Sequence, residues 1–170
     1  MVVLRATQKV LRRLPAIGGT EHASDTALGD WYVNRIVVDR KPFLLLVSSK
    51  SLLAILTHAR DVRTLPERLP QVVSERLGRM HVAAELVDHE RAAMNPVNVG
   101  RTQDRSVLGS MVEFGKLIPY LLSRDRWGLT SLPVVEARLS ETPCRLAGKL
   151  EDTIFPNEEA RRLLEERWFA

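Results

Sequence analysis

The chain has 170 residues, of which 45% are hydrophobic and 27% charged, with nine glycines and nine prolines. This length and composition suit one compact domain and exclude a low-complexity chain. The single cysteine, Cys144, excludes an internal disulfide, and no run approaches the roughly 20 apolar residues that cross a bilayer. Because the first residues lack the pattern of a signal peptide, we expect a cytoplasmic protein.

The net charge is +4 and the sequence pI is near 9.6. Twenty of the 25 basic residues are arginine. This charge is compatible with an anionic partner, either a nucleic acid or an acidic protein, but an arginine-rich genome produces the same excess. The charge alone therefore does not identify a partner.

The first third of the chain predicts strands. β-Branched, aromatic and apolar residues favour strands over 2–6, 31–38 and 43–47, and the unbroken apolar run of the third indicates a strand covered on both faces. The turn 39–42 joins the last two as a hairpin. The short apolar run 52–57 fits either a strand or a helical turn, and we favour a strand.

A short amphipathic helix is expected over 7–14, between the first strand and a polar stretch. Its outer face carries Lys9, Arg12 and Arg13, so the helix presents a basic surface. The stretch 15–30 is rich in Gly, Thr, Ser and Asp and predicts a surface loop.

The middle of the chain predicts two helices and a strand. A helix is expected over 70–78, beginning at Pro70 because proline is tolerated in the first turn and not inside a helix. A second helix over 82–93 follows from its Ala, Glu and Leu content. Residues 97–102 then predict a strand.

The stretch Asp104–Phe114 shows the S-x-x-E spacing of a capping box at Ser110 and Glu113. We therefore expect a helix from about Ser110, with residues 104–109 as a structured approach. Apolar residues at three- and four-residue steps beyond it indicate a helix packed on a sheet. Alternation over 132–139 predicts a last strand, and 158–168 a closing helix.

These elements predict an α+β fold. We expect a single domain over residues 1–170, with a mixed sheet that contains an early antiparallel hairpin and packs against several helices.

Two segments are candidates for a binding site. Asp30, Tyr32 and Asn34 lie close together, and in a strand Tyr32 and Asn34 share a face that is suited to stacking and bonding a base. The alternative is a turn residue followed by core and rim residues.

The second candidate is the loop residues Asp104, Arg105 and Ser106, which precede a helix N-terminus where an anion is favoured. The loop lacks the G-x-x-x-x-G-K-[ST] pattern, so a plain structural connection is the alternative.

Other catalytic patterns are absent from the sequence. His22, His58, His81 and His89 show no metal-ligand spacing, and there is no H-E-x-x-H, C-x-x-C or G-x-S-x-G motif. We therefore expect neither a metal nor a cofactor.

Three stretches resemble an uncharacterised bacterial family of similar length. Residues 4–9, 27–34 and 104–114 are similar to the family stretches L-R-C-T-Q-K-L, L-G-D-W-Y-A-N and N-R-S-V-L-G-S-M-N-D-F, and the resemblance extends over most of the chain. Some relatives look fused to a plasmid open-reading-frame-3-like domain, which implies a link to mobile elements. Ala6, Asp104 and Val112 depart from this pattern, which argues against a catalytic loop.

Two hypotheses follow, and the sequence does not decide whether the protein is an enzyme. The first is a non-catalytic binding or accessory protein, mobile-element or toxin–antitoxin linked, whose basic face meets nucleic acid or an acidic protein. The second is a small enzyme in which Asp30, Tyr32, Asn34, Arg105 and Ser106 converge on one pocket. The basic face of the first hypothesis comprises Arg5, Lys9, Arg12, Arg13, Arg101 and Arg105.

Overall fold

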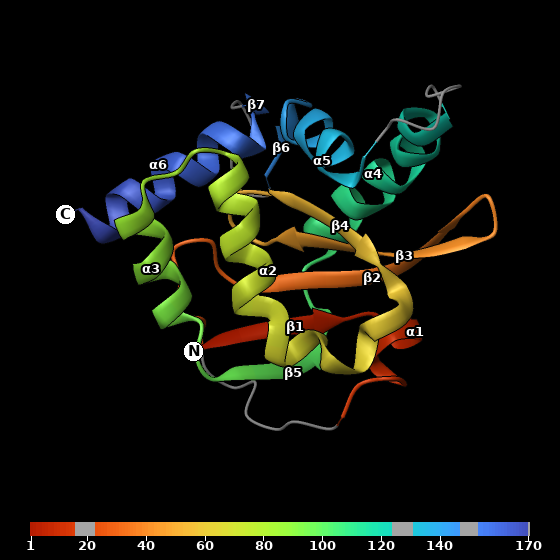
Figure 1. Cartoon of the computed structure of the whole chain (residues 1–170), viewed down its shortest axis with the longest axis horizontal. Coiled ribbons are helices and arrows are strands. Elements are labelled where there is room, and N and C mark those ends of the chain that lie inside the picture. Colours follow the sequence, from red (N-terminus) through yellow and green to blue (C-terminus); the bar gives the residue numbers. More distant parts are fainter. Residues whose placement is uncertain (16–22, 124–130, 147–152, 170) are drawn as a thin grey trace.

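A mixed five-stranded sheet forms the centre of the computed structural model, which describes residues 1–15, 23–123, 131–146 and 153–169 (Figure 1). Its strand order is β4-β3-β2-β1-β5. The strands are β1 (Val2–Ala6), β2 (Trp31–Val38), β3 (Lys41–Ser48), β4 (Ala54–His58) and β5 (Val97–Arg101).

The sheet combines a parallel half with an antiparallel half. β1 runs parallel to both β2 and β5, whereas β3 is antiparallel to β2 and β4. The predicted hairpin is confirmed, with a tighter turn than expected because Asp39 and Arg40 both have positive φ, at 49° and 65°. Two successive left-handed residues match the twist of a two-residue hairpin. Residues 41 and 42 therefore belong to β3 and not to the turn.

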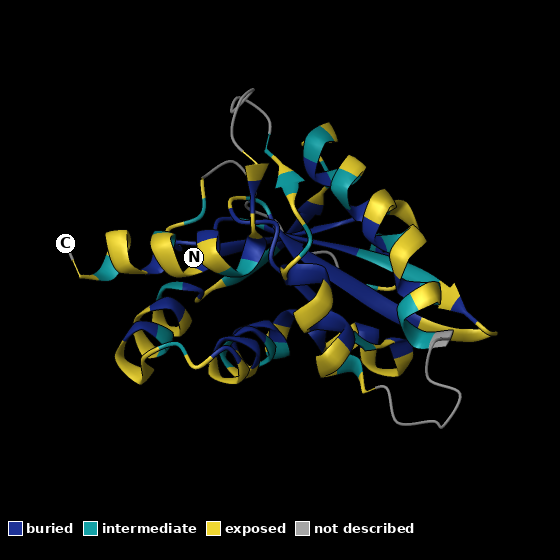
Figure 2. Cartoon of the chain, turned by 90° about the horizontal axis from the view of Figure 1, so that it is seen from above, coloured by how far each residue is buried: buried dark blue, intermediate teal, exposed yellow. Residues whose placement is uncertain are grey.

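Helices cover both faces of the sheet, which Figure 2 shows edge-on as a buried layer. Val10, Leu69, Leu86 and Leu164 lie in one core cluster, whereas Phe114, Ile118, Val135 and Leu139 lie in another. The predicted α+β class with a mixed sheet is thus confirmed. The helices are α1 (Gln8–Leu11), α2 (Leu65–Arg79), α3 (Ala84–Ala93), α4 (Arg105–Ser123), α5 (Leu132–Ser140) and α6 (Pro156–Trp168).

Three short elements complete the described chain. The 3-10 helix η1 (Ala59–Thr64) links β4 to α2, and β6 (Cys144–Arg145) pairs with β7 (Thr153–Ile154). The expectation of one domain over the whole chain stays a prediction.

Helix α2 begins earlier than predicted, at Leu65 and not at Pro70. Pro66 occupies its first turn, where a missing N–H has no cost, and Pro70 lies inside the helix. Pro70 removes one helical hydrogen bond, but Leu69, Val73 and Leu77 are all buried on the same side. Burial of this apolar stripe outweighs the lost bond.

Residues 132–140 form helix α5, so the predicted strand over 132–139 is wrong. Val135 and Leu139 are fully buried and four residues apart, which is a helical repeat. Glu136 is 1% exposed, because its carboxylate accepts the backbone N–H of Leu56 on β4.

The stretch predicted as a surface loop over 15–30 is only partly described, since residues 16–22, including His22, lie outside the described ranges. Ala27 and Leu28 within it are buried. Their backbone N–H groups donate to the carboxylate of Glu90 over 2.8 and 3.0 Å, so this turn is part of the core.

Candidate functional site

The three stretches that carry the family resemblance meet beside β1, near its carboxyl end. β1 and β5 are neighbouring parallel strands, and the helices that follow them lie on opposite faces of the sheet. Helix α1, which follows β1, lies on the same face as α2, whereas α4, which follows β5, lies on the other face. In α/β sheets such a reversal leaves a crevice at the strand ends. The residues there therefore have the right location for a site.

Arg5 and Asp30 form the buried part of this region. Arg5 Nε donates to Asp30 Oδ2 over 2.8 Å, and the two side chains are 6% and 19% exposed. The hydroxyl of Ser24 donates to the other oxygen of Asp30, and Arg5 Nη1 donates to the carbonyl oxygen of Arg101 over 3.4 Å. Arg5 is consequently not part of an exposed basic face.

Asn34 and Tyr32 are also engaged with the neighbouring stretches. The hydroxyl of Thr7 donates to Asn34 Oδ1 over 2.8 Å, and the backbone N–H of Arg35 donates to the same oxygen. The Tyr32 hydroxyl accepts the backbone N–H of Asp104 over 3.1 Å. Both side chains thus join segments of the fold.

Asp104 caps α4, which corrects the predicted helix start at Ser110. Asp104 Oδ1 accepts the backbone N–H of Ser106 over 2.8 Å and that of Val107 over 3.4 Å. Ser110 lies inside the helix and donates to the carbonyl oxygen of Ser106, while Glu113 is exposed and pairs with Lys116. The S-x-x-E spacing therefore does not mark a capping box here.

We call Arg5, Thr7, Asp30, Tyr32, Asn34 and Asp104 the strand-end cluster. Its polar atoms bond mainly to each other and to nearby backbone. Arg105, at the first position of α4, is exposed, and its side chain has no partner in the described part of the chain. The three stretches thus converge to form hydrogen bonds that hold β1, β2 and α4 together.

A second polar region lies where the β2–β3 hairpin meets the β4–η1 corner. It is a pocket of about 550 Å³ between the end of the α1 segment, the β2–β3 hairpin and the β4–η1 corner. We call it the basic pocket. Its lining includes four cations, Arg13, Arg35, Lys41 and Arg60, together with His58.

These four cations have no counter-ion among the described residues. The described residues that line the basic pocket include no acidic residue. Within the described ranges, none of the four side chains makes an ion pair or a hydrogen bond, and the Nε atom of Arg35 is buried without a partner. Four like charges in one recess create a positive potential that attracts an anion.

Sequence reasoning found only part of this pocket. Lys9, Arg12 and Arg13 were predicted on the outer face of one helix; all three are exposed, but only Arg13 lines the pocket. Arg35 and Lys41 were missed because they lie in strands, where each reads as an ordinary polar position. A count of basic residues near both ends of the hairpin could have flagged them.

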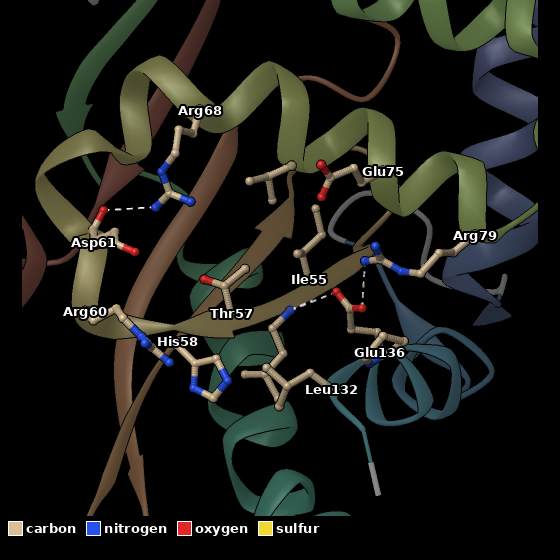
Figure 3. A pocket seen from close by; sticks show the side chains of 13 residues that line it. Ile55, Thr57, His58, Arg60, Asp61, Arg68, Glu75, Arg79, Leu132 and Glu136 are labelled. Atoms are coloured by element: carbon tan, nitrogen blue, oxygen red, sulfur yellow. Dashed lines mark hydrogen bonds and ion pairs between the residues drawn. The ribbon is translucent and has the colours of Figure 1, made fainter.

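A second pocket, of about 420 Å³, adjoins the first and shares His58 and Arg60 with it. It lies between β4, α2 and the start of α5 (Figure 3). In Figure 3, Thr57 and Ile55 rise from β4 towards α2, and Arg68 points from α2 towards β4.

Charges in this second pocket are largely balanced. Arg79 pairs with Glu136 over 2.9 Å, and Arg68 donates to the hydroxyl of Thr64 and the carbonyl oxygen of Asp61, each over 3.0 Å. The hydroxyl oxygen of Thr57 is buried and has no partner in the described ranges. The two pockets therefore differ in charge although they share two lining residues.

Comparison with known proteins identifies a family. Residues 3–159 match the family described as Domain of unknown function (DUF6933). The chain belongs to this family. No curated protein and no solved structure matches it.

In this DUF6933 chain two buried charged side chains, Glu136 and Arg76, make hydrogen bonds to the backbone at the edge strand β4. Glu136 accepts the backbone N–H of Leu56 over 3.0 Å, and Arg76 donates to the carbonyl oxygen of Ala54 over 3.3 Å. Burial raises the pKa of Glu136 and lowers that of Arg76, against the attraction between them. These groups satisfy an otherwise open strand edge, which is a structural role.

The remaining candidates show no built site. Within the described ranges of the DUF6933 chain, no three His, Cys, Asp or Glu residues come together as metal ligands. Cys144 is half-buried, and burial raises the pKa of its thiol. Each described helix also falls short of the length or apolar content that a membrane crossing requires.

Proposed function

We propose that the protein is a non-catalytic nucleic-acid-binding protein whose basic pocket holds a phosphate group. The observation that carries this proposal is the set of four cations without a counter-ion in the described chain. Holding like charges together in a recess destabilises the free protein, and a bound anion removes that cost.

A nucleic acid fits this set better than an acidic protein surface. Three of the four cations are arginines, whose planar guanidinium groups bind two oxygens of one phosphate, or of one carboxylate, at once. A nucleic acid also repeats its charge along the backbone, so the exposed Lys9 and Arg12 on the α1 segment would meet neighbouring phosphates. An acidic protein surface offers no such regular spacing.

The test is equilibrium binding of single-stranded DNA and RNA oligonucleotides, followed by fluorescence anisotropy. With four phosphate contacts, affinity should fall about 50-fold between 50 and 200 mM salt. Arg35→Gln should weaken binding and lower the salt slope by about 0.7. Arg91→Gln is the matched control, because Arg91 is an exposed arginine on α3 and does not line the basic pocket.

No binding to DNA or RNA at 50 mM salt would overturn the nucleic-acid proposal. If poly-glutamate bound instead, and Arg35→Gln weakened that binding, the pocket would serve an acidic protein partner. Equal losses in Arg35→Gln and Arg91→Gln would show only non-specific attraction to a basic chain.

The second candidate is a small enzyme with an anion-holding loop before α4, and the position of that loop at the topological switch point between β1 and β5 supports it. An anion there would have to displace the Asp104 carboxylate from the amides of Ser106 and Val107. An NMR titration with inorganic phosphate separates the candidates. Shifts at those two amides support the enzyme, whereas shifts at Arg35 and Arg60 support the basic pocket.

A further inference from the structure

We infer that the two neighbouring pockets hold the terminal nucleotide of a single strand, with its terminal phosphate in the basic pocket and its nucleoside in the second pocket. This inference rests on the proposed function and specifies its ligand. It concerns a strand end with an unpaired base, in contrast to backbone binding along a duplex.

The first argument is continuity. His58 and Arg60 line both pockets, so the pockets are neighbours at the β4–η1 corner, where a ligand would pass from one into the other. Each pocket is larger than a phosphate alone requires. Sites of about 300–1,000 Å³ are typical for small organic ligands, and each pocket falls in this range.

The second argument is the difference in charge. The basic pocket carries four cations without a partner among the described residues. The second pocket shares only Arg60 with that set, and its cations on α2, Arg68 and Arg79, have partners. A terminal phosphate carries a charge of about −1.5 to −2 and three acceptor oxygens, against −1 for a phosphodiester. The strongly positive recess thus suits the terminal phosphate, and the balanced one suits an uncharged nucleoside.

The third argument is the lining of the second pocket. Leu132 and Pro133 give it apolar surface, and the Arg79–Glu136 ion pair joins α2 to α5 on its lining (Figure 3). Such a recess accepts one unpaired base with its sugar, whereas a paired base is already stacked in a duplex.

The ligand-side experiment compares oligonucleotides of one sequence at about 100 mM salt. The set contains single strands with a 5′-phosphate, a 3′-phosphate or hydroxyls at both ends, and a blunt duplex with phosphorylated ends. At least one phosphorylated single strand should bind about tenfold more tightly than the unphosphorylated strand. The duplex should bind no better than the unphosphorylated strand.

The protein-side experiment fills the second pocket. Val72 lines it from α2 and is half-buried, so Val72→Phe places a ring inside the recess. We expect Val72→Phe to lose most of the preference for the phosphorylated single strand while keeping the salt slope. Gln71→Phe adds the same ring to an exposed neighbouring position that does not line the pocket, and should bind like the unmodified protein. Thermal unfolding of both variants monitors their folding.

Two outcomes separate this inference from the proposed function. Salt-dependent binding with equal affinity for all four oligonucleotides would overturn the terminal-nucleotide inference and leave the proposed function intact. Absence of binding to any oligonucleotide at 50 mM salt would overturn the proposed function itself. The ligand-side comparison stands even if Val72→Phe fails to fold.

Discussion

The strand-end cluster and the basic pocket are both polar regions, and they differ in how their charges are matched. In the cluster, Arg5 has Asp30 and Asp104 has the helix amides. In the basic pocket, Arg13, Arg35, Lys41 and Arg60 have no partner within the described chain. Removing one partner of a matched buried pair destabilises a fold, whereas unmatched like charges in a recess attract an anion. The cluster is therefore the structural joint, and the pocket is the better candidate for binding.

The largest expected effect is in the strand-end cluster. Asp30→Ala leaves the Arg5 guanidinium buried without its carboxylate, which should lower the free energy of unfolding by about 3 kcal/mol. Urea denaturation measures this. Glu113→Ala, which breaks the exposed pair with Lys116, is the control and should change stability by less than about 0.5 kcal/mol. A small effect of Asp30→Ala would contradict the structural role of the cluster.

The basic pocket should show the reverse pattern. Arg13→Gln and Arg35→Gln each remove one cation, so nucleic-acid affinity should fall about tenfold. Stability should stay within about 0.5 kcal/mol, since neither side chain makes an interaction with the described residues that the variant would break. Anisotropy and urea denaturation on the same preparations test both halves. Strong destabilisation would show that Arg13 and Arg35 stabilise the fold, as the residues of the strand-end cluster do.

The cap of α4 gives an intermediate effect. Asp104→Ala removes the acceptor for two backbone N–H groups and should cost about 1 kcal/mol. Ser110→Ala should cost less than about 0.5 kcal/mol, because Ser110 lies within the helix. Denaturation of the two variants side by side decides where the helix is capped. A larger loss in Ser110→Ala would restore the helix start predicted from the sequence.

The smallest effect is expected at Thr57. Its buried hydroxyl has no partner in the described ranges, so Thr57→Val should leave stability unchanged or raise it by up to about 1 kcal/mol. Calorimetric unfolding measures the change. Destabilisation would mean that the hydroxyl is satisfied in solution, as in the strand-end cluster.

Sequence patterns predicted most of the sheet. The prediction was correct for the strands over 2–6 and 31–38 and for the strand that forms the hairpin with 31–38. Alternation and β-branching are local signals that act over a few residues. The fourth strand, favoured over a helical turn, was also correct. The last predicted strand was wrong because Val135 and Leu139 satisfy both periods over so short a run.

The candidate site was predictable only in pieces. Asp30, Tyr32 and Asn34 were identified together, but their partners Arg5, Thr7 and Asp104 come from other parts of the chain. No local pattern indicates which distant side chain completes a hydrogen bond. For the same reason Arg35, Lys41 and Arg60 were not linked to Arg13.

The sequence by itself determined the class of fold, the hairpin and a basic charge, because these follow from local preferences and from composition. Only the tertiary structure decided what the charges do. Packing β1 beside β2 matched Arg5 with Asp30. Folding the hairpin next to the α1 segment and η1 brought four cations together, with no acidic residue among the described residues of that lining. Both results depend on contacts between distant segments, where electrostatic energy varies with distance and burial.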